Sequence, residues 1–252
     1  DLITPVSAFE RIVGDQPGFL LESVEHGERW SRWSFIGRNP LLTIKKIDSQ
    51  LLVEGEIPIE FDVNGQILES VRALQRTLSA PQIENFPPMY SGLLGYLGYD
   101  TVREIEDLPT PANNDLQVPD AILSVIGEVA AFDHWSQRVF LIANAIVKPQ
   151  SSESEITESY YETKNRLDSL MLDGAKPLSE PLLEPPNLNT NSVEVKSTMS
   201  ENDYCGIVEK AKDYILAGDI FQVVLSQRFD FDLEANPFDV YRVLRQINPS
   251  PY

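Results

Sequence analysis

Residues 200–229 change from a helical to a strand-like hydrophobic period across one short corner, and this fixes the order of elements there. Apolar residues recur every three or four positions over 204–215, as on the buried face of a helix. Ser200 is placed to cap this helix, and Gly218 to end it, because glycine enters the left-handed region without steric cost. Apolar and polar residues then alternate over 221–229, which predicts a half-buried strand.

Short alternating runs separated by turn residues indicate antiparallel hairpins in the remainder of the chain. The expected strands lie at 18–25, 41–47, 51–54, 121–132, 139–147 and 192–197. The expected helices lie at 4–13, 67–78, 154–172 and 236–247. This order predicts an α+β protein with antiparallel sheets and helices packed outside.

Three glycines at a spacing of three, Gly92, Gly95 and Gly98, lack the Lys-Ser/Thr pair of a P-loop and the spacing of a dinucleotide site. We expect them to mark close backbone packing in a buried strand. The single Cys205 cannot form an internal disulfide, which suits a reducing cytosol, and we expect it to be a small core residue of its helix.

Composition excludes several classes of function. A formal charge of −19, from 39 acidic and 20 basic residues, repels phosphate backbones and argues against nucleic-acid binding. No apolar run approaches the roughly 20 residues that a membrane helix needs, and no signal peptide is visible, so we expect a cytoplasmic protein. Two histidines and one cysteine cannot build a zinc site of any usual ligand set.

Several separated motifs resemble those of one family. The run AGDIFQVVLSQRF (217–229) resembles the signature of chorismate-utilising enzymes, and most closely that of anthranilate synthase component I. LLES (20–23) with RWSFIG (32–37), GYLGYD (95–100) and NPSPY (248–252) fit the same pattern. The resemblance covers essentially all 252 residues and is loosest in the middle helix and the segment after it.

The resemblance implies a fold and a domain plan. The fold is the orthogonal antiparallel sandwich of chorismate-utilising enzymes, and we expect the chain to be the amino-terminal half of a longer protein. Residues 1–172 correspond to the amino-terminal region, 173–191 to a linker rich in Pro, Asn and Leu, and 192–252 to the start of the chorismate-binding domain.

The implied reaction converts chorismate and ammonia to anthranilate and pyruvate in tryptophan biosynthesis, with feedback inhibition by tryptophan. The resemblance also implies a glutamine amidotransferase partner that supplies the ammonia, and hence a hetero-oligomer. Mg²⁺ would hold the substrate carboxylate, with its ligands expected beyond Tyr252. On that basis we expect the 252 residues alone to lack activity.

Two groups of site residues carry over from the family. LLES and NPSPY meet there in a tryptophan pocket, whose needs are oxygen atoms near the ammonium and flat apolar walls. The matching residues are Glu22, Ser23, Asn248, Pro249, Ser250, Pro251 and Tyr252.

Gln222 is the expected catalytic residue, because relatives that add water to chorismate hold a lysine base at this strand position. A neutral amide orients ammonia but cannot deprotonate water.

Three other functions stay open at the level of the sequence. The large chain of aminodeoxychorismate synthase, from the folate branch, shares the GDIFQ strand, and its product retains pyruvate. A tryptophan-binding module without catalysis would keep the pocket and lose chorismate affinity. The third possibility is a scaffold domain that docks a partner through its acidic surface, and only the motifs argue against it.

Overall fold

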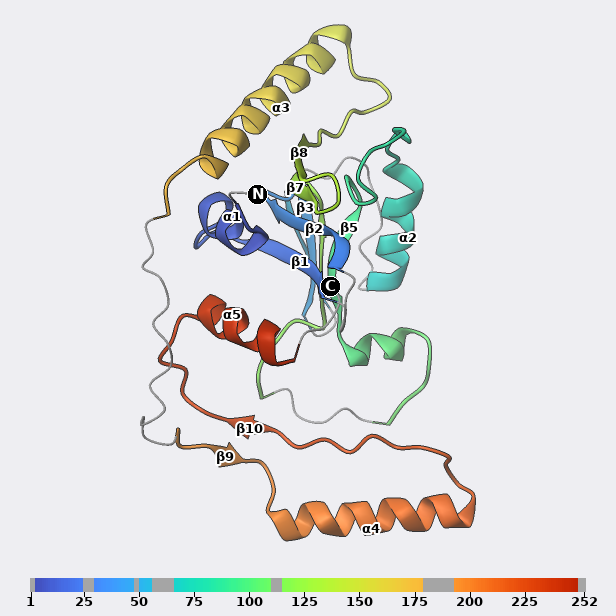
Figure 1. Ribbon diagram of the computed structural model, residues 1–252. Helices are drawn as coiled ribbons and strands as arrows, with labels where there is room; N and C mark the ends of the chain where they lie inside the picture. The colour runs from blue at the N-terminus through green and yellow to red at the C-terminus, as the bar shows by residue number, and fades with distance from the viewer. Residues whose placement is uncertain are drawn as a thin grey trace. The chain divides into compact units, whose positions relative to one another are not determined.

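The structure is a computed structural model, shown in Figure 1. It describes residues 3–24, 30–47, 50–55, 66–109, 115–178 and 193–248. Contacts divide the chain into two compact units, one holding the described residues up to 178 and one holding 193–248. No helix in these stretches is long and apolar enough to cross a membrane.

The first unit contains an antiparallel sheet with the strand order β1–β2–β7–β8. Its strands are β1 (Gly18–Val24), β2 (Trp30–Arg38), β7 (Glu128–Asp133) and β8 (Arg138–Ala143). The structure confirms the hairpin predicted across the turn that follows Asp133. Because β2 pairs with β7 along its length, the early and late parts of this unit form one sheet.

Two helices, α1 (Pro5–Ile12) and α3 (Glu153–Gly174), lie along one face of this sheet (Figure 1). The structure confirms both helices predicted from the sequence, and each begins with a capping box. Their apolar sides bury alternate residues of the strands, as the two-residue period requires. The resulting core cluster consists of Ala8, Ile12, Val13, Ile36, Ala130, Phe132 and Leu170.

A second antiparallel sheet in this unit has the order β4–β3–β6–β5 and carries helix α2 (Ile67–Thr77). Its strands are β3 (Leu42–Ile47), β4 (Gln50–Gly55), β5 (Leu93–Leu97) and β6 (Ala121–Val125). The predicted helix is confirmed, and its Ile67 and Leu74 are fully buried in a cluster with Leu42 and Ile44. Mixed helices and antiparallel sheets are thus the observed fold class.

The single strand expected over 121–132 is wrong, because the chain changes sheets within it. β6 ends at Val125 and β7 begins at Glu128 in the other sheet. A Cβ atom at Gly127 would lie 1.8 Å from the carbonyl oxygen of Asn39, so the crossing passes directly against another backbone. Most of this run is apolar, and its pattern does not show that the two halves join different sheets.

Of the three glycines, Gly95 lies in β5, which is an edge strand among the described residues, so the expectation of a buried strand is corrected. Gly98 precedes the 3₁₀-helix η1 (Tyr99–Glu104). Close backbone packing holds at Gly95, where a Cβ atom would lie 1.8 Å from the carbonyl oxygen of Ile122. It does not hold at Gly92, which has nothing within 4 Å of that position.

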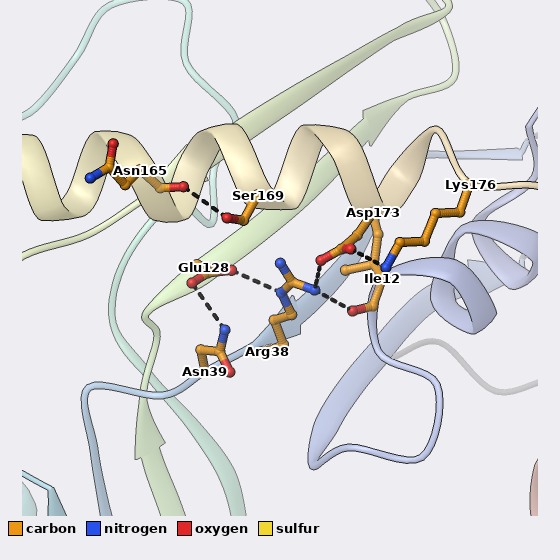
Figure 2. A network of polar contacts seen from close by, with 8 residues as sticks. All are labelled: Ile12, Arg38, Asn39, Glu128, Asn165, Ser169, Asp173 and Lys176. Atoms are coloured by element: carbon orange, nitrogen blue, oxygen red, sulfur yellow. Dashed lines mark hydrogen bonds and ion pairs between the residues drawn. The ribbon is translucent and has the colours of Figure 1, made fainter.

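A polar network ties both helices to the first sheet (Figure 2). The Arg38 guanidinium donates to Glu128 at 2.9 Å, to Asp173 at 2.6 Å and to the carbonyl oxygen of Ile12 at 2.7 Å. Asn39 donates to the second oxygen of Glu128 at 3.1 Å. Since Asp173 belongs to α3, the first residues of the expected linker at 173–191 are helical, whereas 179–192 lie outside the described residues.

The second unit contains α4 (Glu201–Ala217), α5 (Pro237–Ile247) and a two-residue ladder between β9 (Lys196–Ser197) and β10 (Phe229–Asp230). The predicted caps of α4 are confirmed. Ser200 accepts a hydrogen bond from the amide of Asp203 at 3.2 Å, and Gly218 is left-handed with a φ of 82°.

Two predictions for the second unit are wrong. The strand expected over 221–229 is irregular up to Arg228, because alternation supplies an apolar face but the described residues supply no neighbouring strand there. Cys205 is exposed rather than part of a core, and within α4 only Ala211 is buried. The apolar side of α4 therefore has little to pack against among the described residues of this unit.

Candidate functional site

Glu22 is the predicted pocket residue that the structure places most clearly. It lies near the end of β1, is only 8% exposed, and pairs with Ser34 of β2. Directly opposed residues of an antiparallel pair share one face of the sheet, with Cβ atoms about 4.5–5.5 Å apart. The carboxylate and the Ser34 hydroxyl therefore share the sheet face that α1 and α3 cover, and the ladder shifts register just after Glu22.

Ser34 is joined to the turn between β7 and β8. Its Oγ lies 2.8 Å from Nε2 of His134, and the serine is 3% exposed while the histidine is half-buried. The imidazole stacks on Phe132 with ring centroids 6.5 Å apart, and its backbone amide donates to the carbonyl oxygen of Arg32 at 2.9 Å. The imidazole is thus held by its backbone, by a ring and by a hydroxyl.

Asp133 fixes the same turn. Arg32 donates Nε to Oδ1 at 3.1 Å and Nη2 to Oδ2 at 2.8 Å, while the amides of Trp135 and Ser136 donate to Oδ1 at 3.1 and 3.4 Å. The Arg32 guanidinium holds the pKa of the Asp133 carboxyl far below its usual range, although burial acts in the opposite direction. The same guanidinium lies over the rings of Trp33 and Trp135, at 4.8 and 5.3 Å from their centroids.

The other predicted pocket residues are less fully described. Ser23 lies in β1, and its side chain is outside the described part of the structure. Asn248 is exposed at the carboxyl end of α5, in the second unit, and its backbone amide donates to the carbonyl oxygen of Leu244 at 2.9 Å. The remaining four lie outside the described residues: Pro249, Ser250, Pro251 and Tyr252. The tryptophan pocket therefore stays a prediction.

Gln222 lies in the irregular segment between α4 and β10, and its side chain is exposed. Its neighbours Phe221 and Val224 are also exposed, at 101% and 82%. The ladder between β9 and β10 is the one ladder within the described residues 193–248, and it does not include Gln222. The catalytic role of Gln222 stays a prediction.

No expectation from the sequence singled out the contact of Ser34, which lies opposite Glu22, with His134. One signal was available, because alternation along RWSFIGR places Ser34 on the same face as the buried Ile36. Nothing in the sequence indicated that His134 would meet Ser34, since their contact depends on the pairing of β2 with β7.

The described residues do not supply a magnesium site. Among them, no group of three or more His, Cys, Asp or Glu side chains could hold a metal ion. Glu22 lies opposite Ser34 in the ladder between β1 and β2. A single carboxylate is too small a ligand set for a divalent cation, so these described residues do not by themselves fit Mg²⁺.

Comparison with known proteins defines the class. The sequence profile of the chorismate binding enzyme family matches residues 18–252, and the chain belongs to that family. The match begins at β1 and includes Glu22, Ser34, His134 and Gln222.

The particular relatives are more specific. The chain is 37% identical to anthranilate synthase component 1 of Arthrobacter globiformis over 255 residues, and 35% identical to that of Acetivibrio thermocellus over 255 residues. These alignments cover 100% of this chain but 48% and 51% of the relatives, so the chain spans about half their length. The crystal structure of anthranilate synthase component I from Streptococcus pneumoniae matches with a TM-score of 0.64 and 27% identity, over 100% of this chain and 52% of that one.

Proposed function

We propose that this chain is part of the large subunit of an anthranilate synthase, which converts chorismate and ammonia to anthranilate and pyruvate. The observation that carries the proposal is the similarity of the whole chain to proteins of that name, with 37% identity to that of Arthrobacter globiformis and 35% to that of Acetivibrio thermocellus. Family membership supports chorismate as the substrate. The chain would contribute the effector pocket and one wall of the active site.

The proposed ammonia source is a glutamine-hydrolysing partner chain, which makes the active protein a hetero-oligomer. Mg²⁺ is the proposed cofactor, and it would neutralise the carboxylate of chorismate. The described residues gather no group of three side chains that could hold this ion. Their proposed contribution is to bind the effector and to orient ammonia.

The proposed effector is tryptophan, bound at the end of β1. Glu22 is a buried carboxylate near the point where the ladder shifts register, which suits it to bind an ammonium. Ser23 and residues 248–252 are the proposed remainder of the pocket. Occupation of this pocket would reduce synthesis of anthranilate when the end product is abundant.

Gln222 is the proposed group that orients the incoming nucleophile. Ammonia carries its own lone pair, so an amide that only positions it suffices, whereas water must lose a proton. Replacement by lysine should therefore shift the product from an amino to a hydroxyl compound.

A chimera tests the reaction. The chain would replace the matching half of the Streptococcus pneumoniae component I, and fluorescence would follow anthranilate formed from chorismate, an ammonium salt and Mg²⁺. Anthranilate is expected, with release of pyruvate. An aminated product that retains pyruvate would instead assign the chain to aminodeoxychorismate synthesis. A folded chimera that binds tryptophan without turnover would favour a non-catalytic binding module.

The role of Gln222 is tested in the same chimera by Gln222→Lys, with Gln246→Lys as the control. Gln246 is an exposed amide of α5 and gains the same charge on replacement. The proposal expects hydroxylated product from the first variant alone. An unchanged product mixture in Gln222→Lys would show that this amide does not select the nucleophile.

A further inference from the structure

We propose that Ser34 and His134 are positioning residues of the effector pocket, holding the carboxylate of Glu22 in the orientation that binds an amino-acid ammonium. This inference rests on the proposed tryptophan pocket and adds two residues to it. It concerns a polar row that crosses three elements: β1 supplies Glu22, β2 supplies Ser34, and the turn after β7 supplies His134.

The first step is the alignment of the row. Glu22 and Ser34 are directly opposed in the ladder, so their side chains emerge on one face at about 5 Å between Cβ atoms. Both are nearly excluded from solvent, at 8% and 3% exposure. A buried carboxylate is stabilised by hydrogen-bond donors, and the Ser34 hydroxyl is the side-chain donor at the opposed position.

The second step concerns the proton of that hydroxyl. Ser34 has one O–H to donate, and its Oγ lies 2.8 Å from Nε2 of His134. When Nε2 carries a proton and donates to Oγ, the serine proton is left for the Glu22 carboxylate. When Nε2 accepts instead, that proton is used within the pair. Whether Nε2 of His134 carries a proton therefore determines whether the Ser34 hydroxyl can donate its own proton to Glu22.

The third step is the rigidity of the histidine. Its amide is bonded to Arg32, its ring stacks on Phe132, and the turn beside it is tied by four hydrogen bonds to the Asp133 carboxylate. An imidazole held in this way presents Nε2 to Ser34 with little loss of entropy on ligand binding. A strand end that only packs apolar side chains would not need an imidazole held in place by these contacts.

Titration calorimetry of the chimera with L-tryptophan tests the inference, because the proposed pocket includes residues at the end of α5 and the chimera supplies the partners that α5 lacks among the described residues of the 252-residue chain. His134→Ala is expected to weaken the affinity about tenfold. His134→Gln, whose amide nitrogen can donate from the place of Nε2, is expected to restore it to within about twofold. Ser34→Ala should weaken binding similarly, and His134→Ala added to it should cost less than about twofold more, because the histidine acts through the serine.

The outcomes separate this inference from the proposal beneath it. Glu22→Gln should abolish binding, and failure of the parent chimera to bind tryptophan would overturn the pocket and the inference together. Binding by the parent that is lost in Glu22→Gln but unchanged in His134→Ala and Ser34→Ala would overturn the inference alone. Equal losses in His134→Ala and His134→Gln would also overturn it. Should His134→Ala unfold, as judged by circular dichroism, Ser34→Ala and His134→Gln decide.

Discussion

Asp133 is a single side chain on which the turn beside the proposed effector site depends. Its carboxylate accepts two hydrogen bonds from Arg32 and two from backbone amides, and its pKa lies far below the ordinary value of about 3.9. A carboxyl with a lowered folded pKa contributes stability above its unfolded pKa and loses it as the pH falls toward the folded pKa. Asp133→Asn should therefore lower the urea midpoint near neutral pH, and the difference from the parent should shrink below about pH 4.

Tryptophan fluorescence is the measurement for this variant, because all three tryptophans lie in the first unit. Asp168→Asn is the control, since Asp168 forms an exposed pair with Lys164 on α3 and should change the midpoint little at any pH. A pH-independent difference between Asp133→Asn and the parent would contradict the role of the carboxylate charge.

Glu128 carries the most buried charge of the network in Figure 2, at 1% exposure. Its removal would leave the 12% exposed guanidinium of Arg38 with Asp173 as its one charged partner among the described residues. We expect Glu128→Ala to cost about 3 kcal/mol, the lower end of the range for breaking a buried pair. Glu54→Ala, in the more exposed pair with Lys45, should cost about 0.5 kcal/mol or less. Equal losses in urea titrations of the two variants would contradict this account.

At the scale of elements, helix α2 begins without a cap from its own neighbouring residue, and another element caps it. Gln66 makes no side-chain capping bond, whereas Glu104 of η1 accepts from the amides of Ile67 and Leu68 at 2.8 and 2.9 Å. Burial favours the neutral acid, but Lys46 at 2.5 Å and these two amides lower the pKa of Glu104 overall.

Removal of this remote cap should destabilise the first unit. We expect Glu104→Gln to cost about 1–2 kcal/mol, because two amides and a lysine lose a charged acceptor. Glu69→Gln is the matched control, since Glu69 lies in the first turn of the same helix but is exposed, and should cost about 0.3 kcal/mol. The free energy of unfolding from urea titration compares them, and similar values would show that η1 does not cap α2.

At the scale of the whole molecule, local signals predicted elements well and their partners poorly. Helix α4 begins after Ser200 and ends before Gly218 as expected, since caps depend on residues a few positions apart. The crossing at Gly127 and the contact of Ser34 with His134 depend on which strands pair, and a two-residue period does not specify the neighbour. For the same reason the alternation over 221–229 predicted a strand, of which only Phe229 joins a ladder among the described residues.

The two units differ in how much apolar surface they bury. Among the described residues, every buried apolar side chain except Ala211 belongs to the first unit. In the second unit, Val243, Leu244 and Ile247 of α5 are 50%, 53% and 73% exposed. Helices without a buried face are marginal in water, so the two units should differ in local stability.

Hydrogen exchange followed by mass spectrometry measures this difference. Amides of β2 and β7 should be slowed by more than about a thousandfold, which a stability of roughly 5 kcal/mol provides, and those of α4 by less than about tenfold. In the chimera with the Streptococcus pneumoniae protein, α4 and α5 should become strongly protected, because their apolar sides would gain partners. Protection of α4 equal to that of β2 in the 252-residue chain would contradict this, since it requires a core that 193–248 do not show.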